Sequence, residues 1–218
     1  MTEPRPTPGV KVLVFSGSQR KGSLNGQLAV LAAKVAAAHG ATVDLAEPHA
    51  FDVPMYDGDD EATSGIPAGA RALHDRLLAA DAFILASPEY NGSLAGVVKN
   101  LVDWTSRFRP QPFDGKHALL LSASPSLVGG NRGLWALRVP LEHLGTRVFP
   151  DMFSLSGAHK ALVDGDIADP ALRARFDKTI QAFLSMAEAA THYACIKRAW
   201  VEFLGEPHDQ GATDRVDF

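Results

Sequence analysis

A continuous apolar run at residues 82–86, Ala-Phe-Ile-Leu-Ala, limits the folds open to this chain more than any other segment. Side chains on successive strand residues point to opposite faces of a sheet, so an unbroken apolar run predicts a strand that is buried on both faces. Such strands are typical of parallel sheets, whose two faces are covered by helices. The run therefore predicts an α/β protein with a central parallel sheet.

Strand-like and helix-like segments alternate along the rest of the chain, as parallel pairing requires. Strands are predicted at residues 12–15, 42–45, 82–86, 118–122 and 147–149, and helices at 23–38, 67–80, 96–107, 132–144 and from 170 to beyond 186. Each helix is then a crossover between two parallel strands. We predict a flavodoxin-like three-layer α/β/α sandwich with a five-stranded parallel sheet in the order 2-1-3-4-5, whose ligand crevice lies between strands one and three.

The two ends of the chain are expected to lie outside this domain. Residues 1–10 are rich in proline and lack apolar periodicity, so they are predicted to be a disordered lead-in, and residues 11–192 to form one domain. Residues 193–218 would be a C-terminal extension. Within it, the amphipathic residues 196–204 either extend the last helix or pack on a neighbouring subunit, and a mobile polar tail follows.

The composition argues against several classes of partner. A formal net charge of −4 gives no sign of polyanion binding, so nucleic acid is not expected. Cys195 is the only cysteine, which excludes an intrachain disulfide and a cysteine-rich metal site. We find neither an apolar run long enough to span a bilayer nor a signal-like N-terminus, so we expect a cytoplasmic protein with no membrane partner.

Several charged or aromatic residues have simple structural explanations. The acidic residues at 57–61 lack the spacing of a calcium loop and are predicted to form a solvated turn. Lys99 and Asp103 are expected to pair across one helical turn, and Trp104 to lie in the core or an interface. We predict no metal site.

The segment between the first strand and the first helix has the chemistry of a phosphate cradle. Residues 16–25 read Ser-Gly-Ser-Gln-Arg-Lys-Gly-Ser-Leu-Asn. The free amides and dipole of a helix N-terminus favour an anion, and the hydroxyls and Arg20 add donors. The glycine spacing fits neither the dinucleotide fingerprint nor a Walker A loop. A simpler alternative is that Ser23 only caps the helix while Arg20 and Lys21 are solvated.

A second polar loop, residues 87–93, follows the strand at 82–86, and in the predicted strand order it lies next to the first loop. Together the two loops resemble the NADPH-dependent FMN reductase family, which includes bacterial quinone, chromate and azo-dye reductases. The resemblance covers residues 11–186. It rests on the motifs Gly17-Ser18-x-Arg20-x-x-Ser23-x-Asn25 and Pro88-Glu89-Tyr90-Asn91-Gly92-Ser93-x-x-Gly96-x-x-Lys99-Asn100-x-x-Asp103-Trp104.

This resemblance implies a tightly bound FMN, NADPH or NADH as co-substrate, a small-molecule electron acceptor, and a homodimer or homotetramer. The nicotinamide nucleotide and the acceptor would use the same space in turn, in a ping-pong cycle. No catalytic side chain is expected, because the cofactor carries the chemistry.

The resemblance also assigns cofactor-binding residues by matching position. Three loops contribute them: the FMN phosphate would be held by Ser18, Arg20, Ser23, Leu24 and Asn25, the ring and ribityl chain by Pro88, Glu89, Tyr90, Asn91 and Gly92, and the pyrimidine edge by Ser124 and Gly129. Backbone amides of the third loop, residues 122–130, would stabilise the reduced flavin. The chain departs from the family at Ala95, where proline is common.

Two alternatives of other classes stay open. One is a flavodoxin-type electron carrier, although carriers are commonly more acidic and their phosphate loops lack cations such as Arg20 and Lys21. The other is a flavodoxin-like interaction protein without a cofactor. Consumption of NADPH with a quinone separates the enzyme from the carrier, and reconstitution with FMN separates both from the cofactor-free protein.

Overall fold

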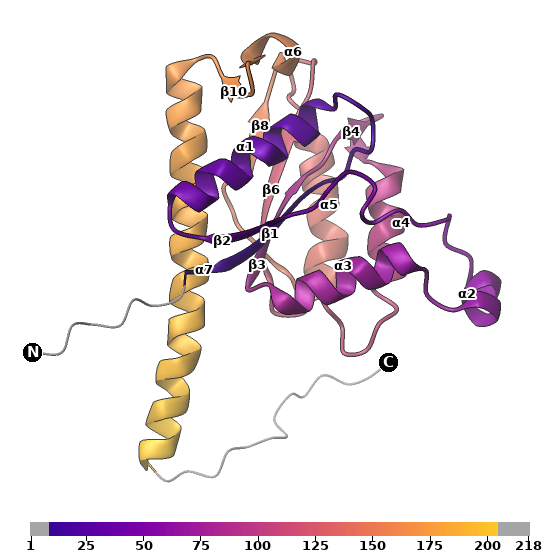
Figure 1. Ribbon diagram of the computed structural model, residues 1–218, viewed down its shortest axis with the longest axis vertical. Helices are drawn as coiled ribbons and strands as arrows, with labels where there is room; N and C mark the ends of the chain where they lie inside the picture. Colours follow the sequence, from indigo (N-terminus) through magenta and orange to yellow (C-terminus); the bar gives the residue numbers. More distant parts are fainter. Residues whose placement is uncertain (1–8, 205–218) are drawn as a thin grey trace, which may run out of the picture.

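A computed structural model describes the backbone of residues 9–204 and the side chains of residues 9–191 (Figure 1). Its central sheet has the strand order β2-β1-β3-β6-β7, with an additional strand, β8, beside β6. The strands are β1 (Lys11–Ser16), β2 (Thr42–Leu45), β3 (Ala82–Ala86), β6 (His117–Ala123), β7 (Arg147–Val148) and β8 (Phe153–Leu155). Every pairing within this sheet is parallel. The predicted strand order is confirmed.

The last position of the sheet differs from the single predicted strand at 147–149. There β7 pairs with the beginning of β6, and β8 pairs with its end. Pro150 lies in the interval between them and has no amide hydrogen to donate to a ladder. The fifth strand is therefore split in two.

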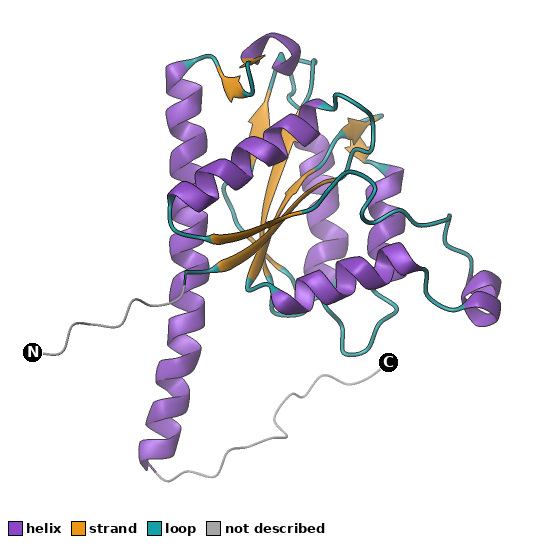
Figure 2. Cartoon of the chain, in the orientation of Figure 1, coloured by secondary structure: helices purple, strands orange, loops and turns teal. Residues whose placement is uncertain are grey.

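Helices cover both faces of the sheet, as Figure 2 shows. They are α1 (Leu24–Ala38), α3 (Ala68–Ala79), α4 (Gly96–Thr105), α5 (Asn131–His143) and α7 (Pro170–Leu204). Buried residues of α1 and α7 share one hydrophobic cluster, and those of α3, α4 and α5 share the other. The predicted three layers are confirmed.

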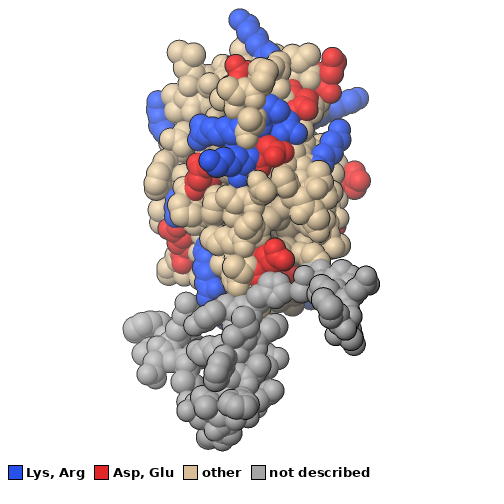
Figure 3. Space-filling view, turned by 90° about the vertical axis from the view of Figure 1, so that its left-hand side faces the viewer, with Lys and Arg blue, Asp and Glu red and all other residues tan. Residues whose placement is uncertain are grey.

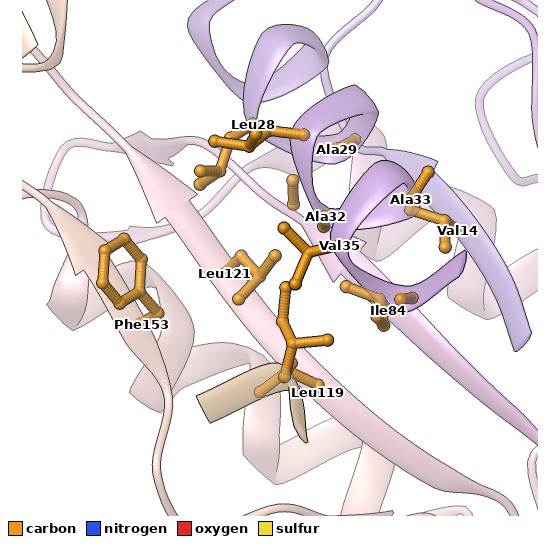
Figure 4. Close-up of a cluster of buried hydrophobic side chains, with 14 of the residues drawn as sticks. Val14, Leu28, Ala29, Ala32, Ala33, Val35, Ile84, Leu119, Leu121 and Phe153 are labelled. Carbon is orange, nitrogen blue, oxygen red and sulfur yellow. The ribbon is translucent and has the colours of Figure 1, made fainter. Parts of the chain in front are cut away.

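Alternation along the strands divides the core between the two faces. Val14 and Ile84 belong to the cluster under α1, whereas Phe15 and Phe83 belong to the opposite one. Figure 4 shows Val14 and Ile84 facing α1, which contributes small residues such as Ala32 to this contact. Small side chains let the helix lie close to the sheet, and this fixes the position of the loop at its N-terminus.

Six short elements, two helices and the four strands of two hairpins, were not predicted. They are α2 (Gly58–Ser64), the hairpin of β4 (Glu89–Tyr90) and β5 (Ser93–Leu94), α6 (Ala158–Ala161), and the hairpin of β9 (Leu162–Val163) and β10 (Asp166–Ile167). The predicted turn at 57–61 was wrong, because Asp57 accepts a hydrogen bond from the Asp59 amide at 2.8 Å and starts a helix. Acidic residues in the first turn of α2 are favoured by the helix dipole.

At both ends of the described chain, ordered structure extends beyond the predicted limits of residues 11 and 192. Val10, placed in the predicted lead-in, is buried, and its carbonyl accepts from the Thr42 amide at 2.9 Å. The backbone of α7 continues to Leu204 and extends past the sheet (Figure 1), so residues 193–204 prolong the last helix. The predicted polar tail, residues 205–218, lies outside the described residues. None of the described helices is apolar over a length that could cross a membrane.

Burial of His117 makes the stability of the fold sensitive to acid. Burial, and secondarily the charge of Arg147, lower the pKa of His117 below its ordinary value, so the folded protein holds this ring neutral. A group whose pKa is lowered in the folded state binds its proton more readily in the unfolded chain. Its contribution to the free energy of unfolding is therefore complete above its unfolded pKa and is lost below it.

The free energy of unfolding is therefore expected to fall between about pH 7 and pH 5, around the unfolded pKa of histidine. Urea denaturation at several pH values measures this. In His117→Leu the fall should be shallower, and an unchanged pH dependence would exclude His117 as its source.

Candidate functional site

Three loops lie side by side at the carboxyl edge of the sheet. The first loop (residues 17–23) follows β1, the second loop (87–95) follows β3, and the third loop (124–130) follows β6. These strands are neighbours, and the pairing continues into the loops: the Gly17 amide donates to Ala86 at 2.9 Å, and the Ser87 amide to Leu121 at 2.8 Å. The three predicted binding segments therefore meet at one edge.

Gly17 allows the first two loops to touch. A β-carbon at this position would lie 2.3 Å from Val98 Cγ2 and 3.6 Å from Pro88 Cδ. Any side chain here would force the first loop away from α4. The glycine thus has a packing function, because only a residue without a side chain fits here.

Asn25 joins the first loop to the third. Its Nδ2 donates to the Ala123 carbonyl at 3.1 Å, and its Oδ1 accepts from the Ala123 amide at 2.9 Å. The side chain is buried, as is Ala123. The side chain bonds to β6 and fixes the distance between the two loops, and the phosphate contact of Asn25 stays a prediction.

The start of α1 offers donors without an acidic partner. Ser23 is the N-cap, and its hydroxyl oxygen accepts from the Gly26 amide at 3.3 Å, while its contact with a phosphate stays a prediction. The Ser23 hydroxyl hydrogen stays available, and the amides of Leu24 and Asn25 donate to no group in the described part of the chain. No acidic residue occupies the first turn. The positive end of the helix dipole therefore faces a region that can accept an anion.

A cavity of about 660 Å³ opens beside these donors. Its walls come from the first loop, the outer side of α1, the start of α4 and the connection after β2, residues 45–52. Among the predicted cofactor residues, Ser18, Arg20 and Ser23 line it; Leu24, Asn25, Pro88, Glu89, Tyr90, Asn91, Gly92, Ser124 and Gly129 do not. Arg20 and Lys21 form no ion pair within residues 9–191. The cavity is thus adjacent to the cations of the first loop.

The second loop forms a β-hairpin. Glu89 pairs with Leu94 and Tyr90 with Ser93, and the two residues between the strands are Asn91 and Gly92. Both have positive φ, 53° and 74°, as a type I′ turn requires. The Asn-Gly pair was a hairpin signal that the sequence interpretation passed over. The hairpin leaves Tyr90 exposed beside the edge of the sheet.

Glu89 fastens this hairpin to α5. Its Oε2 accepts from the Gly133 amide at 3.0 Å, in the first turn of a helix whose N-cap, Gly130, provides no side chain. A carboxylate in this position satisfies a free amide and favours the helix dipole.

We expect Glu89→Ala to reduce the free energy of unfolding by about 1 kcal/mol, as loss of a capping group does. Glu89→Gln, which keeps an oxygen acceptor, should cost less than half of that. Urea denaturation of both variants measures the difference. Equal stabilities for the parent and Glu89→Ala would show that this hydrogen bond does not hold the hairpin.

The third loop lies close over the end of β6. Gly130 has φ 87°, and a β-carbon on it would overlap the Ser122 hydroxyl oxygen at 2.0 Å. That oxygen is buried and has no hydrogen-bond partner among the described residues. Ser124 and Ser126 bond to each other at 3.0 Å, and Gly129 is buried. Leu127 is 95% exposed at the tip of this loop.

Asn100 and Trp104 of α4 support the cavity wall and do not themselves line the cavity. Lys99 pairs with Asp103 at 2.6 Å and Trp104 is 1% exposed, as predicted. The indole nitrogen of Trp104 donates to the Pro54 carbonyl at 2.9 Å, and Asn100 Nδ2 donates to the same oxygen at 2.7 Å. Sequence reasoning assigned Asn100 no role, although it belongs to the quoted motif. These bonds fix the connection that follows β2.

On one face of the molecule the charged side chains do not form a patch of a single sign. On the face that Figure 3 shows, Lys and Arg side chains lie interleaved with Asp and Glu. Within the described residues, no group of three His, Cys, Asp or Glu side chains is placed to hold a metal ion.

Comparison with known proteins identifies relatives of this site. Residues 10–160 match the family described as NADPH-dependent FMN reductase. A quinone reductase of Escherichia coli is 36% identical over 163 residues, which are 73% of this chain and 86% of that protein. An NAD(P)H-dependent FMN reductase of Pseudomonas aeruginosa is 35% identical over 175 residues, 79% of this chain and 92% of the relative. The solved structure of the flavoenzyme NAD(P)H:(acceptor) oxidoreductase from Paracoccus denitrificans has a TM-score of 0.70 and 29% identity, covering 83% of this chain and 98% of that one.

Proposed function

This chain belongs to the NADPH-dependent FMN reductase family, and from that membership we propose that it transfers electrons from NADPH or NADH, through bound FMN, to a quinone or a similar small acceptor. The observation that carries the proposal is the first loop. It combines free amides at the start of α1, the hydroxyls of Ser18 and Ser23, and the guanidinium of Arg20, which forms no ion pair within residues 9–191, beside a cavity. This donor set suits the phosphate of a mononucleotide.

The other two loops fit the remainder of FMN. The hairpin with Tyr90 and the third loop with Leu127 present exposed apolar surface at the same edge as the phosphate cradle. The close approach of Gly130 to β6 brings the third-loop backbone, whose amides would face the pyrimidine edge, down to the sheet. The buried Ser122 hydroxyl, unpartnered among the described residues, is a further polar group beneath this loop.

The protein contributes binding and orientation, and FMN, when bound, supplies hydride acceptance and electron transfer. Arg20 and the α1 amides hold the phosphate, while Asn25 keeps the first and third loops at a fixed spacing. The titratable side chains of the three loops are Arg20, Lys21, Glu89 and Tyr90. Glu89 is bonded to the α5 amide, so none of these residues is assigned as an acid or base.

Initial-rate kinetics test this function. Purified protein with FMN should oxidise NADPH or NADH when benzoquinone is present, and double-reciprocal plots at several quinone concentrations should give parallel lines, the pattern of a ping-pong cycle. A protein that binds FMN but consumes neither nucleotide would instead be an electron carrier of the flavodoxin type.

We also propose that the chain works in the cytoplasm as a homodimer or homotetramer, with neither nucleic acid nor membrane as partner. Trp135 and Val139, one turn apart on α5, are 57% and 70% exposed, which supports contact with another copy. Light scattering on the FMN-loaded protein measures the assembly, and a monomer at micromolar concentration would contradict it.

A further inference from the structure

The cavity is larger than a phosphate cradle needs. Beyond the first loop it continues between the outer side of α1 and the connection that follows β2. We call this part the β2 groove and define it by Gln27, Val30, Lys34, Leu45 and Glu47, all of which line the cavity. The whole cavity, about 660 Å³, is within the range of roughly 300–1,000 Å³ that small-molecule sites occupy. Assigning the FMN phosphate to the first loop leaves the β2 groove without a function.

The groove combines an apolar wall with a cationic rim. Val30 and Leu45 are 41% and 37% exposed, and they belong to the small set of large apolar side chains that the described structure leaves open. Lys34 lies on the same side of α1 as Val30 and forms no ion pair within residues 9–191. Lys21 and Arg20 stand at the junction with the first loop. Apolar surface beside unpaired cations suits a flat apolar group that is linked to phosphate.

The position of the groove in the fold indicates which flat apolar group it would bind. In a βαβ unit that holds phosphate at the start of its helix, the attached nucleoside lies over the carboxyl end of the second strand, where an acidic side chain receives the ribose hydroxyls. Here Glu47 follows the end of β2 by two residues and lines the groove. Phosphate donors, a carboxylate for ribose and an apolar wall for a base therefore occur along one cavity.

We propose that the β2 groove binds the adenosine monophosphate half of FAD, so that the flavin site accepts the dinucleotide as well as FMN. This inference rests on the proposed function, because the groove continues from the FMN phosphate cradle. Lys21 neutralises the second phosphate, Glu47 bonds to the ribose, and the adenine packs on Val30 and Leu45. Each interaction is non-covalent and is absent from the complex with FMN.

Equilibrium binding to the cofactor-free protein tests the proposal, with the quenching of flavin fluorescence as the readout. The parent should bind FAD with a dissociation constant within about tenfold of that for FMN, because new contacts offset the ordering of the longer ligand. Leu45→Glu should weaken FAD about tenfold and FMN less than about twofold, since the new carboxylate would lie only beside the adenine. Leu78→Glu, the same change at an exposed leucine of α3 that does not line the cavity, is the matched control and should alter neither constant. Leu45 and Leu78 are 37% and 49% exposed, so both variants are expected to fold, and thermal unfolding verifies this.

The outcomes separate this inference from the proposed function. Tight FMN binding together with FAD binding weaker by more than about a hundredfold would exclude the groove as a nucleotide site and leave the FMN assignment intact. Equal loss of FMN and FAD in Leu45→Glu would also overturn it, because the effect would then lie in the part that the two ligands share. Failure of the parent to bind either flavin would refute the proposed function and this inference together.

Discussion

Replacement of Asn25 by leucine is expected to lower the free energy of unfolding by about 3 kcal/mol and to weaken FMN binding. The asparagine satisfies both the amide and the carbonyl of Ala123 in a buried position. Leucine has nearly the same volume but leaves both groups without partners, and each unsatisfied buried group costs about 1–3 kcal/mol. The first and third loops would also lose the bond that sets their spacing.

Urea denaturation and FMN titration measure the two effects of Asn25→Leu. The matched control is Asn131→Leu, the same change at an exposed position whose side chain accepts, among the described residues, one long hydrogen bond from Ser154 at 3.5 Å. That variant should change the unfolding free energy by less than about 0.5 kcal/mol. If Asn25→Leu were as stable as this control, the link between α1 and β6 would not be what holds the site together.

Removing the side-chain donors of the first loop should weaken FMN binding without affecting riboflavin, which lacks the phosphate. In the double variant Ser18→Ala/Arg20→Ala, one hydroxyl and the guanidinium are lost. Hydrogen bonds to a charged group contribute about 1.5–3 kcal/mol each, so the dissociation constant for FMN should rise by about a hundredfold or more at low salt. High salt should reduce the difference, because Arg20 is exposed.

Parallel titrations with FMN and riboflavin give the ratio of their two dissociation constants, which isolates the contribution of the phosphate. Lys178→Ala, which removes a cation on α7, serves as the control and should leave both constants unchanged. If the double variant lost affinity for riboflavin as much as for FMN, its effect would come from disturbed folding of the loop. Unchanged FMN affinity would place the phosphate elsewhere.

The layers of the fold were predictable from the sequence because buried strands and helices have recognisable local patterns of apolar residues. The strands at 42–45 and 82–86 have the predicted limits, the second because its apolar run lies between the polar residues Asp81 and Ser87. Ser23 marked the start of α1 in the same way, as a capping residue before an apolar segment. Alternation of these elements indicated parallel pairing, and the strand order followed from the flavodoxin-like fold that five such strands suit.

Features that depend on contacts between residues far apart in the sequence have no such local pattern. The bond between Asn25 and Ala123 joins residues 98 positions apart, and the support of Pro54 by Asn100 and Trp104 is also long-range. The division of the last strand follows from how β7 and β8 each meet β6. The hairpin at 89–94 is different, because its Asn-Gly turn was a local signal.

The same distinction applies to the site. Motif resemblance located the three loops, and the structure brings them to one edge of the sheet. It also shows that Asn25 and Glu89 bond within the protein. No local pattern indicated the cavity on the β2 side, because its walls come from four separate segments.

The central claim is that the three loops bind one FMN that NADPH or NADH reduces and a quinone reoxidises. Anaerobic absorbance spectroscopy of the FMN-loaded protein tests this most directly. One equivalent of nucleotide should abolish the absorbance of oxidised flavin, and one equivalent of benzoquinone should restore it without any partner protein. A spectrum that neither NADPH nor NADH changes, at full occupancy with FMN, would contradict the account.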